Sequence, residues 1–292
     1  MSRLLLRCAA WARPAPLAGL AALALLAPPA VHAAARLTLV TCAPGFPGTT
    51  AEAQPAMDAL AAALAHAAAL PAGELGALYL PGEGEGVARL GQPDAAVALL
   101  SLPFFLEHER ALALTPRLQV ELPGAGALER WTLVAKRGRV AKPADLGGFT
   151  VLSTAGYAPA FVRGALGAWG RLPAAAAVAP TSQILSALRK VAGGADVAVL
   201  LDGAQAAALA SLPFASELQV VARSAPLPAS VVATVGTRLS APRWTPLEKA
   251  FLALHADPAG AAALAGVRMV RFAQLDPAAL AAARAAVAGG AR

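Results

Sequence analysis

The sequence has 292 residues, 58% of them hydrophobic and 14% charged, with 24 Lys and Arg, 17 Asp and Glu and two Cys. This length is sufficient for one large domain or two lobes. The basic residues are scattered, with no run and no interleaved aromatic residues, so nothing indicates a nucleic-acid partner.

The first 35 residues have the three parts of a secretion signal. Arg3, Arg7 and Arg13 make the start positive, an apolar stretch follows at 17–26, and small residues at 33–35 offer a cleavage site. The apolar stretch is shorter than the roughly 20 residues that a spanning helix needs, which favours a cleaved signal over the alternative of a membrane anchor. We therefore predict a signal peptide at 1–35 and export from the cytoplasm.

Cleavage would change the charge and the cysteine content of the working protein. Loss of the three leader arginines leaves 21 basic and 17 acidic residues, a net charge of +4 in place of +7. Only Cys42 remains, so no internal disulfide is possible. Because Cys42 ends an apolar run, we predict a buried structural thiol in preference to a catalytic one. No long apolar run follows residue 35, so we predict that the mature chain does not span a membrane.

The first part of the mature chain predicts alternating strands and helices. Apolar runs at 37–42, 78–80 and 95–100 predict strands, and Met57, Leu60, Ala61 and Leu64 recur at helical spacing. Pro55 and Asp58 are typical of the first turn of that helix. This order predicts an α/β fold, with a parallel sheet flanked by helices.

A second unit begins near Glu129, and a helical tail follows it. The predicted strands are 131–135, 149–152, 176–178, 197–201, 218–221 and 231–235. The predicted helices include Val162, Leu166 and Trp169, ending at Gly170, and then Ile184, Leu185, Leu188 and Val191. Helix starts are predicted where a capping residue precedes proline, at Thr245-Pro246, Asp257-Pro258 and Asp276-Pro277.

The sharpest local motif lies where a buried strand passes into a helix. It reads Ser153-Thr154-Ala155-Gly156-Tyr157. Free backbone N–H groups and the helix dipole favour an anion at such a place, hydroxyl groups add donors, and Gly156 would allow close backbone approach. A plain helix cap is the alternative, since Ser and Thr prefer caps, and the residues leave both open.

Other candidate ligand residues follow predicted strands. Asp202 ends a buried strand and could accept a hydrogen bond from a ligand, or it could cap the helix that follows. Ser101 ends its strand in the same way. Phe46 and Tyr157 are candidate aromatic walls of a binding site, although core packing is common for such residues.

The residues give no sign of catalytic chemistry. His66, His108 and His255 do not have metal-ligand spacing, and no Gly-x-Ser-x-Gly elbow or paired acid and base is present. We predict no enzyme activity, no catalytic residue, no metal site and no cofactor.

From Glu129 onward the chain resembles the phosphate, phosphite and phosphonate-type family of periplasmic solute-binding proteins, which serve ABC importers. The resemblance rests on an Asp-Leu-x-Gly step at 145–148, on 153–157, which is similar to Ser-Thr-Ser-Gly-Tyr, on a Gly-x-x-Asp-x-Ala step before 198, and on the crossing at 220–228. Motifs support the resemblance over roughly 100 residues, and the order of strands and helices supports it over the rest. Each motif alone is weak, and their order and spacing together make the resemblance specific.

This resemblance implies a two-lobed, type 2 periplasmic binding protein fold. Lobe one would comprise 36–128 and 229–292, lobe two would comprise 129–228, and a ligand would bind in the cleft between them. Ser153, Thr154 and Gly156 would donate hydrogen bonds to phosphoryl oxygens, and Ala155 removes one hydroxyl that the family usually has. Asp202 would meet the other end of the ligand.

The functional prediction is a periplasmic solute-binding protein that captures a small oxyanion for the permease of an ABC importer. The alternative is a ligand-sensing or adaptor module of the same fold, acting on a membrane partner without transport. An enzyme on this fold is disfavoured because no catalytic constellation is present.

Overall fold

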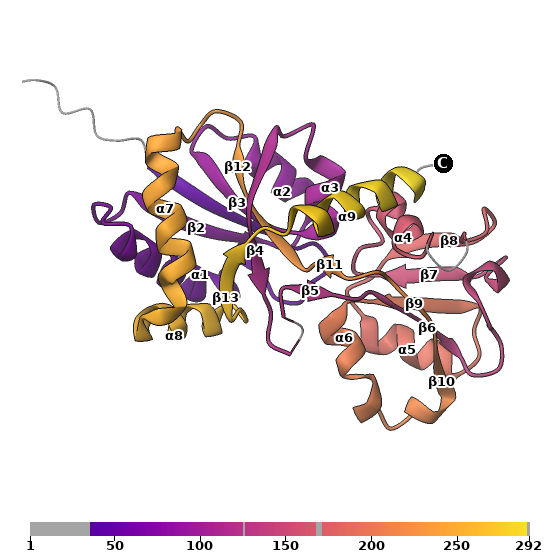
Figure 1. Ribbon diagram of the computed structural model, residues 1–292. Coiled ribbons are helices and arrows are strands. Elements are labelled where there is room, and N and C mark those ends of the chain that lie inside the picture. The colour runs from indigo at the N-terminus through magenta and orange to yellow at the C-terminus, as the bar shows by residue number, and fades with distance from the viewer. Residues whose placement is uncertain (1–35, 125, 168–170, 291–292) are drawn as a thin grey trace, which may run out of the picture. The chain divides into compact units, whose positions relative to one another are not determined.

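The computed structural model describes residues 36–124, 126–167 and 171–290 (Figure 1). The predicted signal peptide lies outside these residues, as do Trp169 and Gly170 at the predicted end of a helix. Within the described residues, no helix combines the length and the apolar character that crossing a membrane requires.

The first sheet has six strands in the order β13-β4-β12-β3-β1-β2. β1 lies parallel to both β2 and β3, as predicted, but β12 and β4 run antiparallel to their neighbours, so the sheet is mixed and the expectation of a mostly parallel sheet is wrong. Its strands are β1 (Leu37–Cys42), β2 (Leu75–Leu80), β3 (Ala95–Ser101), β4 (Leu114–Glu121), β12 (Ser230–Val235) and β13 (Arg271–Gln274).

Helices cover both faces of this sheet. On one face Leu37 and Leu39 pack with α1, α7 and α8, and on the other Val40 and Cys42 pack with α2, α3 and α9. Both faces of β1 are therefore buried, which explains its apolar run without alternation. The helices are α1 (Thr50–Ala67), α2 (Glu83–Leu90), α3 (Leu102–His108), α7 (Ala241–Ala253), α8 (Pro258–Gly266) and α9 (Pro277–Gly290).

Two predicted helix starts are wrong. Thr49 forms a capping box with Glu52, so α1 begins at Thr50 and Pro55 lies inside the helix. α7 begins at Ala241, and the hydroxyl of Thr245 donates to the carbonyl of Ala241 at 3.0 Å inside the helix. A hydroxyl that bonds back four residues earlier cannot cap a helix start at its own position.

The other two predicted starts are confirmed. The carboxylate of Asp257 accepts the N–H of Gly260 at 2.9 Å at the start of α8. The carboxylate of Asp276 accepts the N–H groups of Ala278 and Ala279 at the start of α9. Both carboxylates satisfy backbone donors that a helix start leaves free.

The second sheet has five strands in the order β10-β6-β9-β7-β8. β7 lies parallel to β8 and β9, whereas β6 lies antiparallel to β9 and β10. The strands are β6 (Thr132–Lys136), β7 (Thr150–Ser153), β8 (Ala177–Pro180), β9 (Val197–Leu201) and β10 (Leu218–Arg223). The helices are α4 (Pro159–Ala165), α5 (Ile184–Ala192) and α6 (Gly203–Ala207), and 3₁₀ turns lie at Pro143–Asp145, Leu209–Ser211 and Ala215–Glu217. A further 3₁₀ turn, Leu254–Ala256, follows α7 beside the first sheet.

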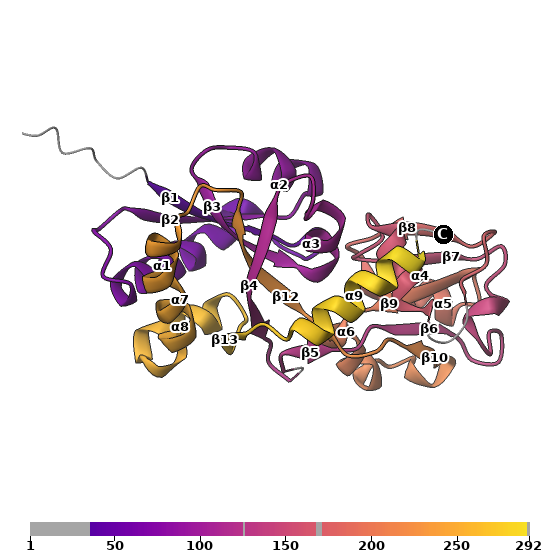
Figure 2. The ribbon, with the colours of Figure 1, turned by 45° about the horizontal axis from the view of Figure 1, so that its top comes forward.

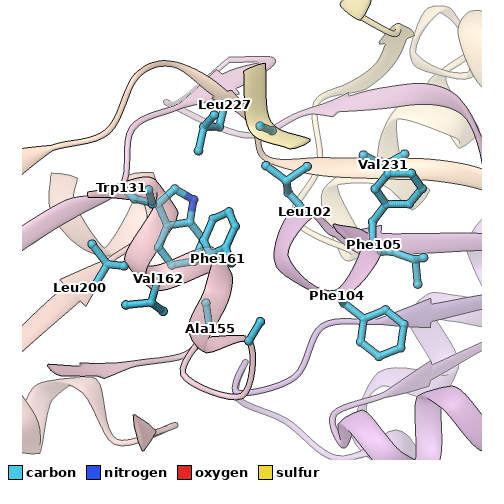
Figure 3. Packing of buried hydrophobic residues seen from close by; sticks show 14 of the residues in the cluster. Leu102, Phe104, Phe105, Trp131, Ala155, Phe161, Val162, Leu200, Leu227 and Val231 are labelled. Atoms are coloured by element: carbon cyan, nitrogen blue, oxygen red, sulfur yellow. The ribbon is translucent and has the colours of Figure 1, made fainter. Parts of the chain in front are cut away.

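The chain passes between the two sheets at a short ribbon. β5 (Leu128–Glu129) pairs antiparallel with β11 (Leu227–Pro228), and Glu129 lies opposite Leu227. After β13, α9 contacts α4 beside the second sheet, as Figures 1 and 2 show. One hydrophobic cluster joins the sides of the two sheets. It contains Phe105 of α3, beside the first sheet, and Phe161 of α4, beside the second (Figure 3).

Candidate functional site

A small cavity lies at the strand ends, where loops of the two sheets meet. The volume open to the centre of a water molecule is about 10 Å³, which is room for about one water. Ten residues line it: Pro44, Phe46, Ser101, Pro103, Glu129, Trp131, Thr154, Ala155, Tyr157 and Ala229. The cavity therefore takes residues from the first sheet, from the β5 ribbon and from the second sheet.

Five of the eight predicted site residues line this cavity. They are Phe46, Ser101, Thr154, Ala155 and Tyr157. The other three do not line it: Ser153 and Gly156 flank Thr154 and Ala155 in the chain, and Asp202 is a neighbouring charge of Glu129. The convergence brings together residues that are more than 100 positions apart in the sequence.

Thr154 follows the last residue of β7 and carries an unpartnered hydroxyl. Its side chain is 2% exposed, and its Oγ1 has no hydrogen-bond partner among the described residues. The hydroxyl oxygen of Ser153 accepts the N–H of Ala155 at 3.2 Å, which leaves its own O–H able to donate. Ser153 thus shapes the turn that presents Thr154 to the cavity.

Gly156 contributes to packing. A Cβ at this position would overlap the backbone of Ala179 and Pro180 in β8. Its N–H donates to the carbonyl of Ser153 at 3.1 Å, inside the same turn. The close backbone approach that was expected toward a ligand is made toward β8.

Tyr157 and Ser101 join the two sheets across the cavity. Their hydroxyl oxygens lie 3.3 Å apart, a distance at which either can donate to the other. Burial raises the pKa of Tyr157 above its usual range, with smaller contributions from Cys42, Glu83 and Glu107, so the phenol is neutral. Phe46 lies at the rim, where it is 37% exposed.

Trp131 lies just before β6 and lines the cavity, although sequence analysis did not single it out. Its ring packs edge-on against Phe161, with centroids 5.0 Å apart (Figure 3). Its backbone exchanges hydrogen bonds with Ser224, whose hydroxyl accepts the Trp131 N–H at 2.9 Å. The indole Nε1 is buried and, among the described residues, has no hydrogen-bond partner.

Glu129 is the second lining residue that was not predicted. Its side chain is 5% exposed, and its Oε2 accepts the N–H of Gly203 at 2.9 Å. Burial and the neighbouring Asp202 raise the pKa of Glu129 to about 8, against a smaller lowering from the Gly203 N–H and the nearby Trp131 indole. The carboxyl is therefore mostly protonated at pH 7.

Asp202 caps α6, which was one of its two predicted roles. Its Oδ1 accepts the N–H of Gln205 at 2.8 Å, and the Gln205 side chain accepts the N–H of Asp202 in return. Its Oδ2 is buried without a partner among the described residues. Burial raises the pKa of Asp202, and the cap hydrogen bonds oppose this. The carboxyl is not among the cavity-lining groups.

Cys42 is buried, as predicted. It is 0% exposed, and its pKa is raised to about 12 by burial, with smaller contributions from Glu83 and Glu85. A thiol with this pKa is almost entirely protonated at neutral pH and is a poor nucleophile.

Comparison with known proteins gives structural neighbours only. No family profile matches the sequence, and no curated protein matches it. The fold is similar to XAC2383 from Xanthomonas citri bound to a chloride ion, with a TM-score of 0.70 and 18% identity over 87% of this chain and 98% of that one. The same protein bound to ATP gives a TM-score of 0.67 at 17% identity, over 88% and 98% of the two chains.

Two further neighbours carry phosphonate in their descriptions. One is a binding protein component of an ABC phosphonate transporter from Pseudomonas aeruginosa, with a TM-score of 0.61 and 13% identity over 88% of this chain and 87% of that one. The other is PhnD1 from Prochlorococcus marinus in complex with methylphosphonate, with a TM-score of 0.54 and 11% identity over 84% and 94%. The chain thus has the two-lobed α/β fold of type 2 periplasmic binding proteins.

Proposed function

We propose that this protein is an extracytoplasmic solute-binding protein that captures a small anion, such as phosphate, phosphite or a phosphonate, in the cavity at Thr154 and Trp131. The observation that carries this proposal is that two residues lining one cavity, Thr154 and Trp131, each have a buried polar atom, Oγ1 and Nε1, without a hydrogen-bond partner among the described residues.

Unpartnered polar groups are costly to bury, so their presence calls for an explanation. A buried donor without a partner costs about 1–3 kcal/mol. An indole N–H can only donate, so its missing partner is a hydrogen-bond acceptor. An anion supplies such an acceptor, and the Thr154 hydroxyl can donate to the same ligand.

The size of the cavity limits which anions can enter without movement of the surrounding loops. Room for about one water suits a single atom such as chloride. A phosphoryl group would require the loop at Pro44 and Phe46 to move away from the turn at Thr154. The β5–β11 ribbon is where we place a hinge, between lobe one at 36–128 and 229–292 and lobe two at 129–228.

The remaining parts of the proposal are supported by analogy. The descriptions of the neighbours name chloride, methylphosphonate and an ABC phosphonate transporter as ligands or context of those proteins. By the same analogy we propose a periplasmic location after cleavage of the signal at 1–35, and an ABC permease as partner. The ligand-binding residues would be Thr154, Trp131, Ser101 and Tyr157, with Phe46 at the rim.

A ligand screen tests this proposal. The mature chain is titrated at pH 6.5 with phosphate, phosphite, methylphosphonate, sulfate and chloride, by thermal unfolding and by calorimetry. A ligand present at 100 times its Kd should stabilise the protein by about 2.7 kcal/mol.

A pair of tryptophan variants locates the binding site. Trp131→Phe removes the free indole N–H and should weaken the best ligand about tenfold or more. Trp244→Phe makes the same change in the core of the first sheet, where the ring packs against Phe251, and should leave affinity unchanged. If no anion stabilises the wild type, the proposal fails, and equal losses in both variants would remove Trp131 from the site.

A further inference from the structure

We propose that Glu129 determines which ligand charge the site accepts. In its protonated form the carboxyl donates a hydrogen bond to a singly charged anion, and in its ionised form it repels that anion. This inference rests on the proposed anion-binding function and adds to it a limit on ligand charge and a coupling between ligand and proton.

The position of Glu129 makes this role possible. The side chain lines the cavity and is 5% exposed, so water screens it little. One carboxyl oxygen, Oε2, accepts the Gly203 N–H at 2.9 Å, and the indole of Trp131 lies near enough to the carboxyl to lower its pKa. When the carboxyl is protonated, its O–H can donate toward a ligand beside Trp131 and Thr154.

The surrounding charges leave Glu129 without a cationic partner. None of the ten lining residues is Lys, Arg or His. Arg130, the next residue in the chain, donates to the carbonyl of Ser224 at 2.9 Å. The titratable neighbours that face Glu129 are Asp202, at the start of α6, and the neutral phenol of Tyr157 across the cavity.

While Glu129 is protonated, an anion in this cavity would therefore meet only neutral hydrogen-bond donors. Once Glu129 ionises, the anion would meet a negative charge. The pKa of Glu129, raised to about 8, keeps the protonated state populated at neutral pH. A dianion would bring a second charge into a lining without a cation, which favours monoanions over dianions. Binding above the pKa of Glu129 would require the uptake of one proton.

The test uses anions whose charge does not change with pH. Chloride and nitrate serve as monoanions and sulfate as a dianion, each titrated by calorimetry between pH 6 and pH 9.5. In the wild type we expect the affinity for the monoanions to be level below pH 7 and to fall about tenfold per pH unit above pH 8. Sulfate should bind more weakly than nitrate throughout.

Variants separate this role from a general charge effect. Glu129→Gln keeps the size and a donor but cannot ionise, so its affinity for nitrate should be flat across this pH range. Glu107→Gln removes an exposed acid near Tyr157 and should keep the wild-type profile. Should Glu129→Gln fail to fold, wild-type calorimetry at pH 8.5 in buffers of different ionisation enthalpy should still report uptake of about one proton per nitrate.

The possible failures are distinguishable. Nitrate affinity that is independent of pH in the wild type, or that falls equally with pH in Glu129→Gln, overturns the role of Glu129. After either result, the proposed anion-binding function still stands if phosphate or phosphite binds at pH 6.5. Absence of binding by every anion at pH 6 defeats the proposed function, and this inference with it.

Discussion

A Cβ built on Gly45 would lie 2.8 Å from the carbonyl oxygen of Thr154. Gly45 follows β1 of the first sheet, and Thr154 follows β7 of the second, so this contact joins the loops of the two sheets at the cavity. Gly45 also has a φ of +82°, a conformation that glycine adopts at little cost. Both the close approach and the backbone conformation select glycine at this position.

Replacement of Gly45 by alanine should therefore weaken ligand binding. The new methyl group would overlap backbone atoms of Thr154, which cannot rotate away, so the loop and the turn would separate. We expect at least a tenfold loss of affinity for chloride, the anion whose size matches the closed cavity, measured by calorimetry, and a loss of about 1 kcal/mol in unfolding free energy from the positive φ.

Gly48→Ala is the matched control. Gly48 lies in the same loop with a φ of +105°, and a Cβ there meets nothing within 4 Å. It should lose similar stability and keep wild-type affinity. An equal loss of affinity in both variants would show that loop strain, and not contact with Thr154, controls binding.

The sequence predicted those parts of the fold that depend on local patterns. Uninterrupted apolar runs indicated β1, β3 and β9, and aspartate before proline indicated the starts of α8 and α9. β4 was not predicted, because Pro116 interrupts its pattern and its pairing with β12 joins residues more than 100 positions apart. Antiparallel pairing of this kind depends on tertiary contacts that local periodicity does not contain.

The candidate site was predicted where its residues follow strands. Ser101 was identified because ligands of α/β sheets bind where strands end, and Thr154 because a buried strand passes into a helix there, where free N–H groups favour an anion. Glu129 and Trp131 were not, because they lie at the chain crossing, where the neighbouring residues give no strand-end signal. An acid and a tryptophan two residues apart, on either side of Arg130, are a usable signal, because both carry polar groups that need partners when buried.

Thr154→Val should weaken ligand binding while it stabilises the free protein. Valine keeps the branched shape and removes a buried hydroxyl that has no partner among the described residues. We expect about a tenfold loss of affinity, equivalent to roughly 1.4 kcal/mol, and a gain of about 1 kcal/mol in unfolding free energy without ligand.

Thr41→Val provides the comparison for this change. Thr41 lies in β1 and is 9% exposed, and its hydroxyl also lacks a partner in the part of the chain that the structure describes, but it does not line the cavity. It should gain similar stability in urea denaturation with no change in affinity. Wild-type affinity in Thr154→Val would exclude its hydroxyl from the ligand contacts.

The stability of the free protein should fall between pH 5 and pH 8 because of Glu129. Its pKa is raised from an ordinary value of 4.5 to about 8 in the folded state. Below pH 4.5 both states hold the proton, and the stabilising contribution is complete. Between these values only the unfolded state releases it, so stability falls by up to about 1.4 kcal/mol per pH unit and levels off above pH 8.

Urea denaturation of the wild type and Glu129→Gln at several pH values measures this contribution. The variant should show a flatter profile across pH 5–8, with a residual slope of the same sign from Asp202, whose pKa is also raised. Asp94 does not interfere, because Arg89 and Thr38 lower its pKa to about 2 and its contribution is lost only in stronger acid. Parallel profiles for the two proteins would show that Glu129 ionises normally in the folded state.

Contact between α4 and α9 should depend on the absence of a side chain at Gly164. A Cβ at Gly164 would overlap the backbone carbonyl of Ala286 in α9, so Gly164→Ala would force the helices apart and should lower the unfolding free energy by about 1–3 kcal/mol. Gly289→Ala, in α9 with nothing within 4 Å, should instead stabilise by up to about 1 kcal/mol through helix propensity. Opposite signs in urea denaturation are the expected result. Stabilisation by both variants would mean that α9 does not hold this contact in solution.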